Sequence, residues 1–444
     1  MKILIVCYSY FPELSPRAFR WTAIAEELVR LGHRVEVICA SSASQAGHEC
    51  VNGVEIHRTG SNAREVVKRW LRLEATVAPV KNGANIGAPV SSRGKFGGFI
   101  KMVYSHTVRK ILWPDFAAFW YFSALKTAHQ IIRKGLPDVV VTVSLPYTGH
   151  LVGLALKRCY ATRWVVDIGD PFSFMTETPV NNTKLFKALN TRSESLVLHM
   201  ADAVAVTTEG TRLEYLKCFS TIGQSKIVVL PPLFAAPQTL DGSAPYFKLP
   251  NKIRLVFAGT LYRTIRNPVA LLELFRDLMS TPLGATLELH FYGVMNDCKP
   301  CFDPYGDLLG SNIFIHGLVP RAEAVRAMQE ATVLVNLGNS TAYQLPSKVV
   351  EYVMLGKPVL NVTKLDSDSS RNFFSDFAGV CNISEHELAS DSAALDRVRN
   401  FVENPPVIAP TYVEKLARTH GLQAITQNYL ALLHDSTHPA HHHV

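Results

Sequence analysis

Short apolar runs alternate with amphipathic segments along most of this chain. The run at 2–7 precedes a segment whose apolar residues Ile24, Leu28 and Leu31 share one helical face, which predicts a helix over 17–31. Strands that are apolar throughout are typical of a parallel sheet covered by helices on both faces. The first half therefore predicts a doubly wound α/β domain. Its further expected strands are 34–39, 54–57, 138–143, 164–167 and 203–206, and its further expected helices are 119–133, 149–158 and 184–200.

The alternation stops at a stretch rich in proline, alanine and small residues, and then it starts again. That stretch, 231–251, predicts a linker. The predicted fold class is α/β, with two Rossmann-like domains facing a cleft, residues 1–230 and 252–420, before a C-terminal helix and disordered tail over 421–444. In the second domain we expect strands at 253–259, 287–293, 313–317 and 332–337, and helices at 268–279 and 321–331.

The composition is that of a globular protein with two domains. The chain has 444 residues, of which 48% are hydrophobic and 18% are charged. No run of about 18 uninterrupted apolar residues occurs, so no membrane span is predicted. The start, 1–8, lacks a secretory apolar region, and the eight cysteines follow no disulfide spacing. We therefore expect a protein of the reducing cytoplasm.

The net charge of +8 is concentrated in one segment. Residues 64–110 hold ten basic and two acidic residues, so their excess equals that of the whole chain. Aromatic residues such as Trp70 and Phe96 are interleaved with the charges. The mixture predicts contact with an anionic membrane surface, on the inner face of the membrane; a solvated basic loop is the alternative. Nucleic acid is not an expected partner, because no nucleic-acid-binding motif accompanies the segment.

The sequence contains no complete motif for binding a cofactor or a metal ion. No G-x-G-x-x-G follows the first strand and no Walker motif occurs, which argues against a dinucleotide oxidoreductase and a P-loop NTPase. Cys298 and Cys301 form a lone C-x-x-C, whereas structural zinc needs a second ligand pair. Asp366 and Asp368 form a D-x-D, for which we expect a solvated loop. Neither a metal nor a cofactor is predicted.

The run at 345–360 holds the most specific candidate site. Pro346 suits the first turn of a helix and Gly356 its end, which predicts a short helix with Lys348 and Glu351 on one face. The N–H groups at the helix start and Lys348 favour an anion, and Glu351 can accept hydrogen bonds from sugar hydroxyls. These groups fit a nucleotide-sugar, with its diphosphate and its hydroxyls. An ordinary surface ion pair is the alternative.

Further candidates lie in loops that follow predicted strands, where ligands of α/β sheets bind. In the second half, the loop 259–267 begins with a glycine that permits close approach of a ligand, and it carries two arginines that can neutralise a diphosphate. In the first half, the loop ending at 15–17 carries a basic residue, His150 opens a helix, and Asp167 and Asp170 end a strand. Exposed helix residues, a structural histidine and a turn cap are the alternatives for these three.

The ordered set of segments resembles glycosyltransferase family 4, retaining enzymes with the two-domain GT-B fold. The order and spacing of the pieces carry the resemblance, which extends over most of the chain. Tyr343 stands where many members have a first glutamate, and Pro346-Ser347-Lys348 ahead of Glu351 resembles a subset that builds bacterial surface saccharides. The matching pieces are 2–6, 17–21, 31–37, 167–171, 257–261, 316–317 and 346–360.

The resemblance implies transfer of a sugar from a nucleotide-diphosphate sugar to a saccharide or lipid-linked acceptor, with retention and without a metal. A nucleotide-sugar epimerase of the same fold and a catalytically silent saccharide-binding protein are the alternatives. The donor residues it implies are Gly259, Thr260, Arg263, Arg266, Lys348 and Glu351. The acceptor residues are Ser15, Pro16 and Arg17, and the catalytic residues are His150, Asp170 and Lys348.

Overall fold

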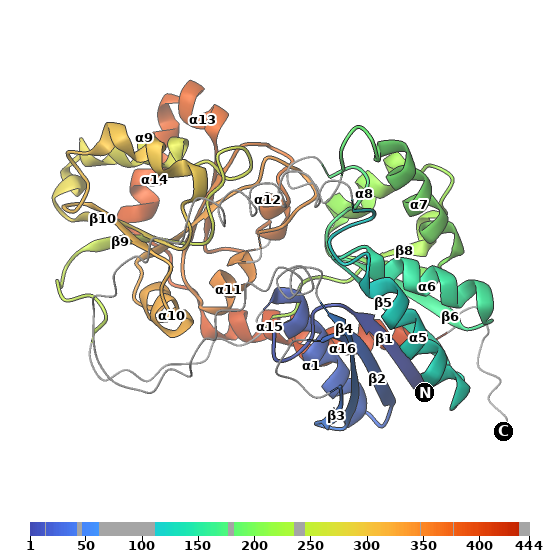
Figure 1. The fold of residues 1–444 in the computed structure, drawn as a ribbon. Coiled ribbons are helices and arrows are strands. Elements are labelled where there is room, and N and C mark those ends of the chain that lie inside the picture. Colours follow the sequence, from blue (N-terminus) through green and yellow to red (C-terminus); the bar gives the residue numbers. More distant parts are fainter. Residues whose placement is uncertain are drawn as a thin grey trace, which may run out of the picture. The chain divides into compact units, whose positions relative to one another are not determined.

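The protein divides into two compact units. Figure 1 shows both units, with the chain coloured from blue at the N-terminus to red at the C-terminus. A computed structural model describes residues 1–13, 15–41, 47–61, 112–175, 182–234, 245–346, 348–375 and 377–434. The first unit holds the described residues of Met1–Ala205, Ile222–Ile227 and Leu432–Val444, and the second holds those of Val206–Thr221 and Val228–Ala431. The basic segment 64–110 and the C-terminal tail lie outside the described residues. The predicted domain boundaries remain predictions.

The first sheet has eight strands in the order β3-β4-β2-β1-β5-β6-β7-β8. β1 pairs in parallel with β2 and with β5, and β5 pairs in parallel with β6. The side chains of β1 from Ile3 to Val6 are fully buried, so the first apolar run forms part of a core. The strands are β1 (Lys2–Cys7), β2 (Arg34–Ser41), β3 (His48–Val51), β4 (Val54–Ser61), β5 (Val139–Ser144), β6 (Arg163–Ile168), β7 (Ala203–Val206) and β8 (Ile227–Val229).

One hairpin at the edge of this sheet was not predicted. β3 pairs antiparallel with β4 through Asn52 and Gly53, whose φ angles are +50° and +80°. Two successive residues with positive φ form the turn that matches the twist of a two-residue hairpin, and Asn-Gly is its strongest sequence signal. β4 also continues to Ser61, past the end expected at 57.

Among the described residues, the α-helices of the first unit are α1 (Pro16–Arg30), α5 (Trp120–Arg133), α6 (Thr148–Cys159) and α7 (Lys187–Met200). The sequence starts α1 in two ways. The Oγ of Ser15 accepts a hydrogen bond from the Ala18 N–H at 3.2 Å, and Pro16 occupies the first turn, where no N–H is needed. Trp21, Ile24 and Leu28 then lie buried on one side, as their spacing predicts.

The second unit has a six-stranded sheet in the order β11-β10-β9-β12-β13-β14, in which every pair is parallel. Its central strands are buried and mostly apolar, which confirms the predicted parallel architecture, although polar residues such as Arg254, Glu288 and Asn336 are buried among them. The strands are β9 (Ile253–Ala258), β10 (Leu287–Tyr292), β11 (Ile313–Gly317), β12 (Val333–Leu337), β13 (Val359–Thr363) and β14 (Val380–Ser384).

Helices surround the second sheet, as the ribbon of Figure 1 shows. Leu272, Phe275 and Leu278 of α9 belong to one buried cluster, and Val349 and Val353 of α11 belong to another. Among the described residues, no helix has the length and hydropathy that a membrane crossing requires. The α-helices are α8 (Glu209–Cys218), α9 (Val269–Met279), α10 (Arg321–Gln329), α11 (Lys348–Met354), α12 (Ser369–Phe373), α13 (Glu385–Ser390), α14 (Ser392–Glu403), α15 (Pro410–His420) and α16 (Leu422–Leu433).

Candidate functional site

Three loops of the second unit meet at one edge of its sheet. They follow β9, β12 and β13, neighbouring parallel strands whose carboxyl ends lie together. In the first loop the backbones of Tyr262 and Arg266 exchange two N–H to O hydrogen bonds, of 3.2 and 2.8 Å. This exchange closes a tight turn that leaves the Arg263 side chain exposed. The turn therefore places the two predicted arginines in different surroundings, with Arg263 in solvent and Arg266 partly buried.

Arg266 joins the loop after β9 to the loop after β12. Its Nη2 donates to Oδ1 of Asn339 at 2.8 Å, and its Nη1 donates to the Thr260 carbonyl oxygen at 3.3 Å. Its Nε is buried and has no hydrogen-bond partner among the described residues. Burial lowers the pKa of this guanidinium, but arginine begins from so high a value that it stays charged near neutrality. Asp368 attracts this guanidinium electrostatically, but its hydrogen bonds go to neutral oxygens, so it can still bind an anion.

Asp368 lies in the loop after β13, and the expectation of a solvated loop is wrong for it. The side chain is fully buried, and its Oδ1 accepts a hydrogen bond from the Ser370 N–H at 2.7 Å, which caps α12. Burial raises the pKa of this carboxyl group. A Cβ added to Gly338 would lie 2.5 Å from Oδ2, so that glycine lets the loop carrying Asn339 pack against Asp368. Asp366, in contrast, is 88% exposed, as expected.

The predicted pair Lys348 and Glu351 on α11 is in contact, and it has a third member. Lys348 Nζ forms an ion pair with Oε2 of Glu351, while Nη2 of Arg321 lies 3.2 Å from Oε1. No local pattern pointed to Arg321, which is 30 residues from Glu351 and is brought there by α10. Each carboxylate oxygen of Glu351 meets one cation and keeps acceptor capacity for a hydroxyl.

Tyr352 fixes α11 against the end of β9. Its hydroxyl donates to the Ala258 carbonyl oxygen at 3.2 Å and accepts from the Ala258 N–H at 3.0 Å. The helix ends at Gly356, as predicted, with φ +62° and an N–H to O bond of 3.0 Å to Val353. Because α11 has only seven residues, we assign the positive charge of this site to side chains and not to the helix start.

Gly259 lies where the ends of β9 and β10 touch. The Gly259 N–H donates to the Tyr292 carbonyl oxygen at 2.9 Å, and a Cβ added to Gly293 would lie 1.9 Å from the Gly259 carbonyl oxygen. Gly293 has φ +122°, a value that side chains rarely allow. Because neither glycine has a side chain, the backbones after β9 and β10 pack closely together beside Arg266.

In the first unit, His150 lies buried at the start of α6, with 1% of its surface exposed. Its Nδ1 is 2.8 Å from Oγ1 of Thr142, and that oxygen also accepts the indole N–H of Trp164 at 2.9 Å. The Thr142 hydroxyl hydrogen is therefore best directed at Nδ1, which assigns the imidazole proton to Nε2. Nε2 has no hydrogen-bond partner among the described residues.

The charge state of His150 follows from its surroundings. Burial, and then the positive charge of Arg17, lower the pKa of His150 from 6.5 to about 3. The ring is therefore neutral at pH 7, and its Nε2–H is a hydrogen-bond donor that the described protein leaves unsatisfied. Such a donor suits a neutral oxygen, as in a sugar hydroxyl, better than it suits proton transfer near neutrality.

Arg17 and Asp170 complete this cluster. Nη2 of Arg17 lies 3.7 Å from Oδ2 of Asp170, and the guanidinium covers Gly169, where an added Cβ would lie 0.8 Å from Nη2. The loops after β1 and β6 and the start of α6 thus bring Arg17, Asp170 and His150 to one edge of the first sheet. Ser15 and Pro16 start the helix that carries Arg17.

Asp167 was predicted to be a site residue beside Asp170, but its side chain lies in the core. Its carboxylate is buried, and Oδ2 accepts the indole N–H of Trp21 at 2.5 Å. The partner is 146 residues away in the sequence, so the pattern of residues gave no sign of it. Asp167 therefore joins α1 to β6 inside the core, and Asp170 alone is the carboxylate at the strand end.

Two successive parallel sheets with polar loops at their carboxyl ends define the GT-B class, and solved structures agree. HepE of Anabaena, in complex with UDP and glucose, is 12% identical with a TM-score of 0.59, over 98% of this chain and 99% of that chain. The lipopolysaccharide outer core galactosyltransferase WaaB is 12% identical with a TM-score of 0.56, over 97% and 98%. UDP-GlcNAc 2-epimerase of Methanocaldococcus jannaschii is 14% identical with a TM-score of 0.51, over 98% and 99%. At these identities the likeness establishes the fold.

The family match is more specific. Residues 18–232, slightly less than half of the chain, match the family described as "Glycosyl transferase 4-like domain". The match confirms the predicted class, a glycosyltransferase. It includes His150 and Asp170 and begins one residue after Arg17. A comparison with curated proteins found no match.

Proposed function

We propose that this protein transfers a sugar from a nucleotide-diphosphate sugar to a saccharide or lipid-linked acceptor in cell-surface polysaccharide biosynthesis. The observation that carries the proposal is Arg266, a guanidinium bonded only to neutral oxygens and aimed between three strand-end loops. In this scheme Arg266 neutralises the diphosphate of the donor, with bidentate contacts available to a phosphate. Glu351 accepts hydrogen bonds from ribose hydroxyls, and Gly259 and Thr260 permit the close approach of the ligand.

The first unit would bind the acceptor. The unsatisfied Nε2–H of His150 would hold a hydroxyl of the sugar, and Asp170 would accept a hydrogen bond from the acceptor. Arg17 holds Asp170 in place by its ion pair, and Ser15 and Pro16 hold Arg17 by starting its helix. Because His150 is neutral, its task in this scheme is to position the substrate.

We further propose that the reaction keeps the anomeric configuration and needs no metal ion. The departing diphosphate would be stabilised by Arg266 and Lys348, fixed positive charges that need no reorganisation during the reaction. The anomer of the product, read by proton NMR from its coupling constant, tests retention. Turnover that is unchanged after exhaustive treatment with EDTA tests independence from metal.

A donor panel is the direct experiment. The full-length protein is incubated with UDP- and GDP-sugars and a panel of saccharide and lipid-linked acceptors, and release of nucleoside diphosphate is followed. We expect release that depends on the acceptor and that Arg266→Ala abolishes. Release of diphosphate without any dependence on acceptor would indicate hydrolysis and would remove the transferase proposal.

The same fold supports a second candidate, since a UDP-GlcNAc 2-epimerase is among the structures that this chain resembles. An epimerase would interconvert nucleotide-sugars with no acceptor present, which chromatography of the sugar nucleotides detects. A silent saccharide-binding protein would bind donor or acceptor without turnover. The panel therefore separates all three activities.

We also propose that the protein works in the cytoplasm, on the inner face of the membrane. The basic segment 64–110 supports the membrane contact through its charge and its interleaved aromatic residues. Replacing its basic residues by glutamine should lower sedimentation with anionic vesicles. Unchanged sedimentation would assign any membrane contact to other residues.

A further inference from the structure

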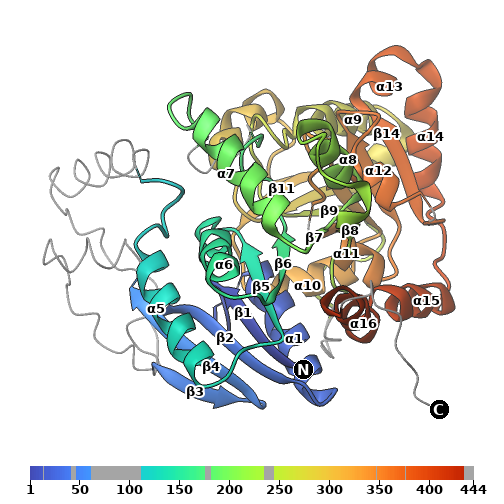
Figure 2. The same ribbon diagram turned by 90° about the vertical axis from the view of Figure 1, so that its right-hand side faces the viewer.

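Helices α5, α6 and α7 form one continuous layer on the first unit. α6 packs against both α5 and α7, and the helices lie side by side in Figures 1 and 2. Each helix buries one side, through residues such as Ala128 of α5, Leu156 of α6 and Val197 of α7. Their remaining side chains form an outer surface, which we call the α5–α7 face.

The α5–α7 face has positive charge, and its three helices carry no exposed carboxylate. Residues 116–137, 148–160 and 182–200 contain eight lysines and arginines and a single acidic residue, Glu194. Glu194 is buried, and its oxygens accept the N–H groups of Phe172 and Ser173 at 3.2 and 2.8 Å. Lys157 pairs with Asp202, and the other basic residues are exposed: Lys126, Arg133, Lys134, Arg158, Lys184, Lys187 and Arg192.

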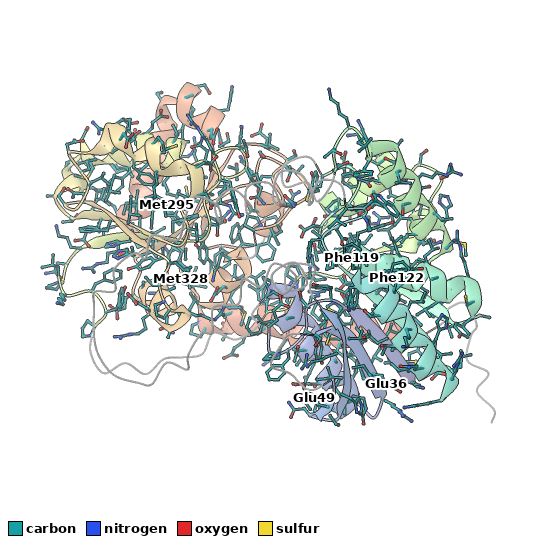
Figure 3. The ribbon with its side chains drawn as sticks, in the orientation of Figure 1. Glu36, Glu49, Phe119, Phe122, Met295 and Met328 are labelled. Carbon is teal, nitrogen blue, oxygen red and sulfur yellow. The ribbon has the colours of Figure 1, made fainter. Side chains whose placement is uncertain are left out.

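Large apolar side chains stand out from the same helices. Phe119 and Phe122, labelled in Figure 3 at the start of α5, are 61% and 71% exposed. Leu185, Leu189 and Leu196 are also exposed, and their spacing of four and seven residues puts them on one side of α7 and the turn before it. A surface that exposes leucine and phenylalanine among basic residues is typical of proteins that lie on a bilayer.

Helices α13 and α14 of the second unit are balanced in charge, so the α5–α7 face differs from them. On α14, Arg397 pairs with Asp391 at 2.5 Å, and Arg399 pairs with Asp396 at 2.9 Å. Arg397 also reaches Glu387 on α13 at 3.2 Å. Acidic and basic side chains therefore alternate on α13 and α14, whereas exposed acidic side chains are missing from α5, α6 and α7 among the described residues.

We propose that the α5–α7 face docks on a bilayer that contains anionic lipids. The lysines and arginines meet the negative headgroups, and the leucines and phenylalanines enter the boundary between headgroups and acyl chains. The exposed leucines distinguish this partner from nucleic acid, whose phosphate backbone offers them no apolar contact. This surface contains none of the residues of segment 64–110, and the proposal does not depend on the transferase reaction.

Vesicle sedimentation with charge-reversed variants tests the proposal. The full chain is mixed with vesicles of phosphatidylcholine alone or with one quarter phosphatidylglycerol. Each basic residue close to an anionic surface raises partitioning by about fivefold. The variant Lys184→Glu, Lys187→Glu, Arg192→Glu should therefore bind the anionic vesicles at least about tenfold more weakly, and wild-type binding should fall as salt rises.

A matched control makes the same change in net charge on the second unit. Lys299, Lys415 and Arg418 are exposed there, and their joint replacement by glutamate should leave vesicle binding within about twofold of the wild type. Equal losses in the two triple variants would mean that net charge alone drives binding, and would overturn the proposal. So would retention of full binding by the α7 variant, or binding to an acidic protein or to RNA but not to vesicles.

Insertion of the apolar residues is tested without removing any charge. The single change Phe122→Trp places an indole at an already exposed position, and lipids brominated near the headgroup quench indoles that enter the bilayer. We expect the fluorescence that Phe122→Trp adds to the wild-type signal to be quenched by brominated anionic vesicles. Added fluorescence that is not quenched, in a protein that sediments with the vesicles, would show docking through another surface and overturn the proposal.

Discussion

The strand-end loops of the two units carry the same kind of residue in opposite electrostatic settings. In the first unit Arg17 lies over Gly169 and pairs with the carboxylate of Asp170 at 3.7 Å. In the second, Arg266 donates to the neutral oxygens of Thr260 and Asn339. A cation that forms an ion pair beside a neutral histidine suits hydroxyl groups. Arg266 is attracted to the buried carboxyl group of Asp368, but its hydrogen bonds go to neutral oxygens, which suits a diphosphate. The partners of the arginine, and not its mere presence, therefore separate the proposed acceptor site from the proposed donor site.

Removing the guanidinium of Arg266 should have the largest effect. We expect Arg266→Ala to weaken binding of the nucleoside diphosphate at least about 100-fold, because buried charged pairs lose several kcal/mol when one partner is truncated. Isothermal titration calorimetry with UDP and GDP measures the loss. Arg263→Ala is the matched control on the same turn, and its exposed side chain should matter by less than about threefold. A larger loss in the control would reverse the assignment of the two arginines.

Changing the carboxylate of α11 should have a smaller effect that depends on the ribose. We expect Glu351→Ala to weaken nucleotide binding about 30-fold, since a hydrogen bond to a charged group contributes about 2 kcal/mol. The loss should nearly disappear when the 2′-deoxy nucleotide is used, if the carboxylate meets that hydroxyl. Equal losses with ribose and deoxyribose would show that Glu351 acts by holding Lys348 and Arg321 in place.

Breaking the balanced pair should impair the acceptor step alone. In Gly169→Ala the new methyl group takes the place of the Arg17 guanidinium, so we expect kcat/KM for the acceptor to fall about tenfold, near 1.4 kcal/mol. Binding of the nucleoside diphosphate should not change. Gly223→Ala is the control, because a Cβ there meets nothing within 4 Å and its φ is −60°. A fall in nucleotide affinity in Gly169→Ala would contradict the division of tasks between the units.

The smallest expected effect is on stability as pH falls. His150 has a folded pKa of about 3 and an unfolded value of 6.5, so unfolding takes up a proton between these pH values and stability is lost as pH drops below 6.5. At pH 6 the wild type should have lost about 1 kcal/mol that the variant His150→Gln keeps. Urea denaturation of both proteins at pH 8 and pH 6 measures the difference. Parallel pH profiles for the two proteins would mean that His150 is accessible to protons in the fold.

The sequence predicted the parts of the fold that local patterns encode. Apolar runs marked the buried strands, and Gly356 marked the end of α11. The hairpin of β3 and β4 was missed although Asn52 and Gly53 are a clear turn signal, because the strand before them is short and half exposed.

Contacts between distant residues account for most of the remaining differences. The role of Asp167 depends on Trp21, and the surroundings of Glu351 depend on Arg321. No local pattern contains such pairs. The choice between Arg263 and Arg266 depended on a turn that only the backbone bonds of Tyr262 reveal. The sequence therefore predicted the set of candidate side chains better than it predicted which of them are exposed, paired or buried.

The stacking of Arg17 on Gly169 also has a consequence for how this protein can evolve. The space above that glycine holds either a guanidinium or a side chain at 169, and not both. A change at one position therefore alters which residues the other accepts, so the two positions are linked in their permitted substitutions. In a library that randomises both codons, side chains at 169 should survive selection mainly where Arg17 has already been replaced by a smaller residue.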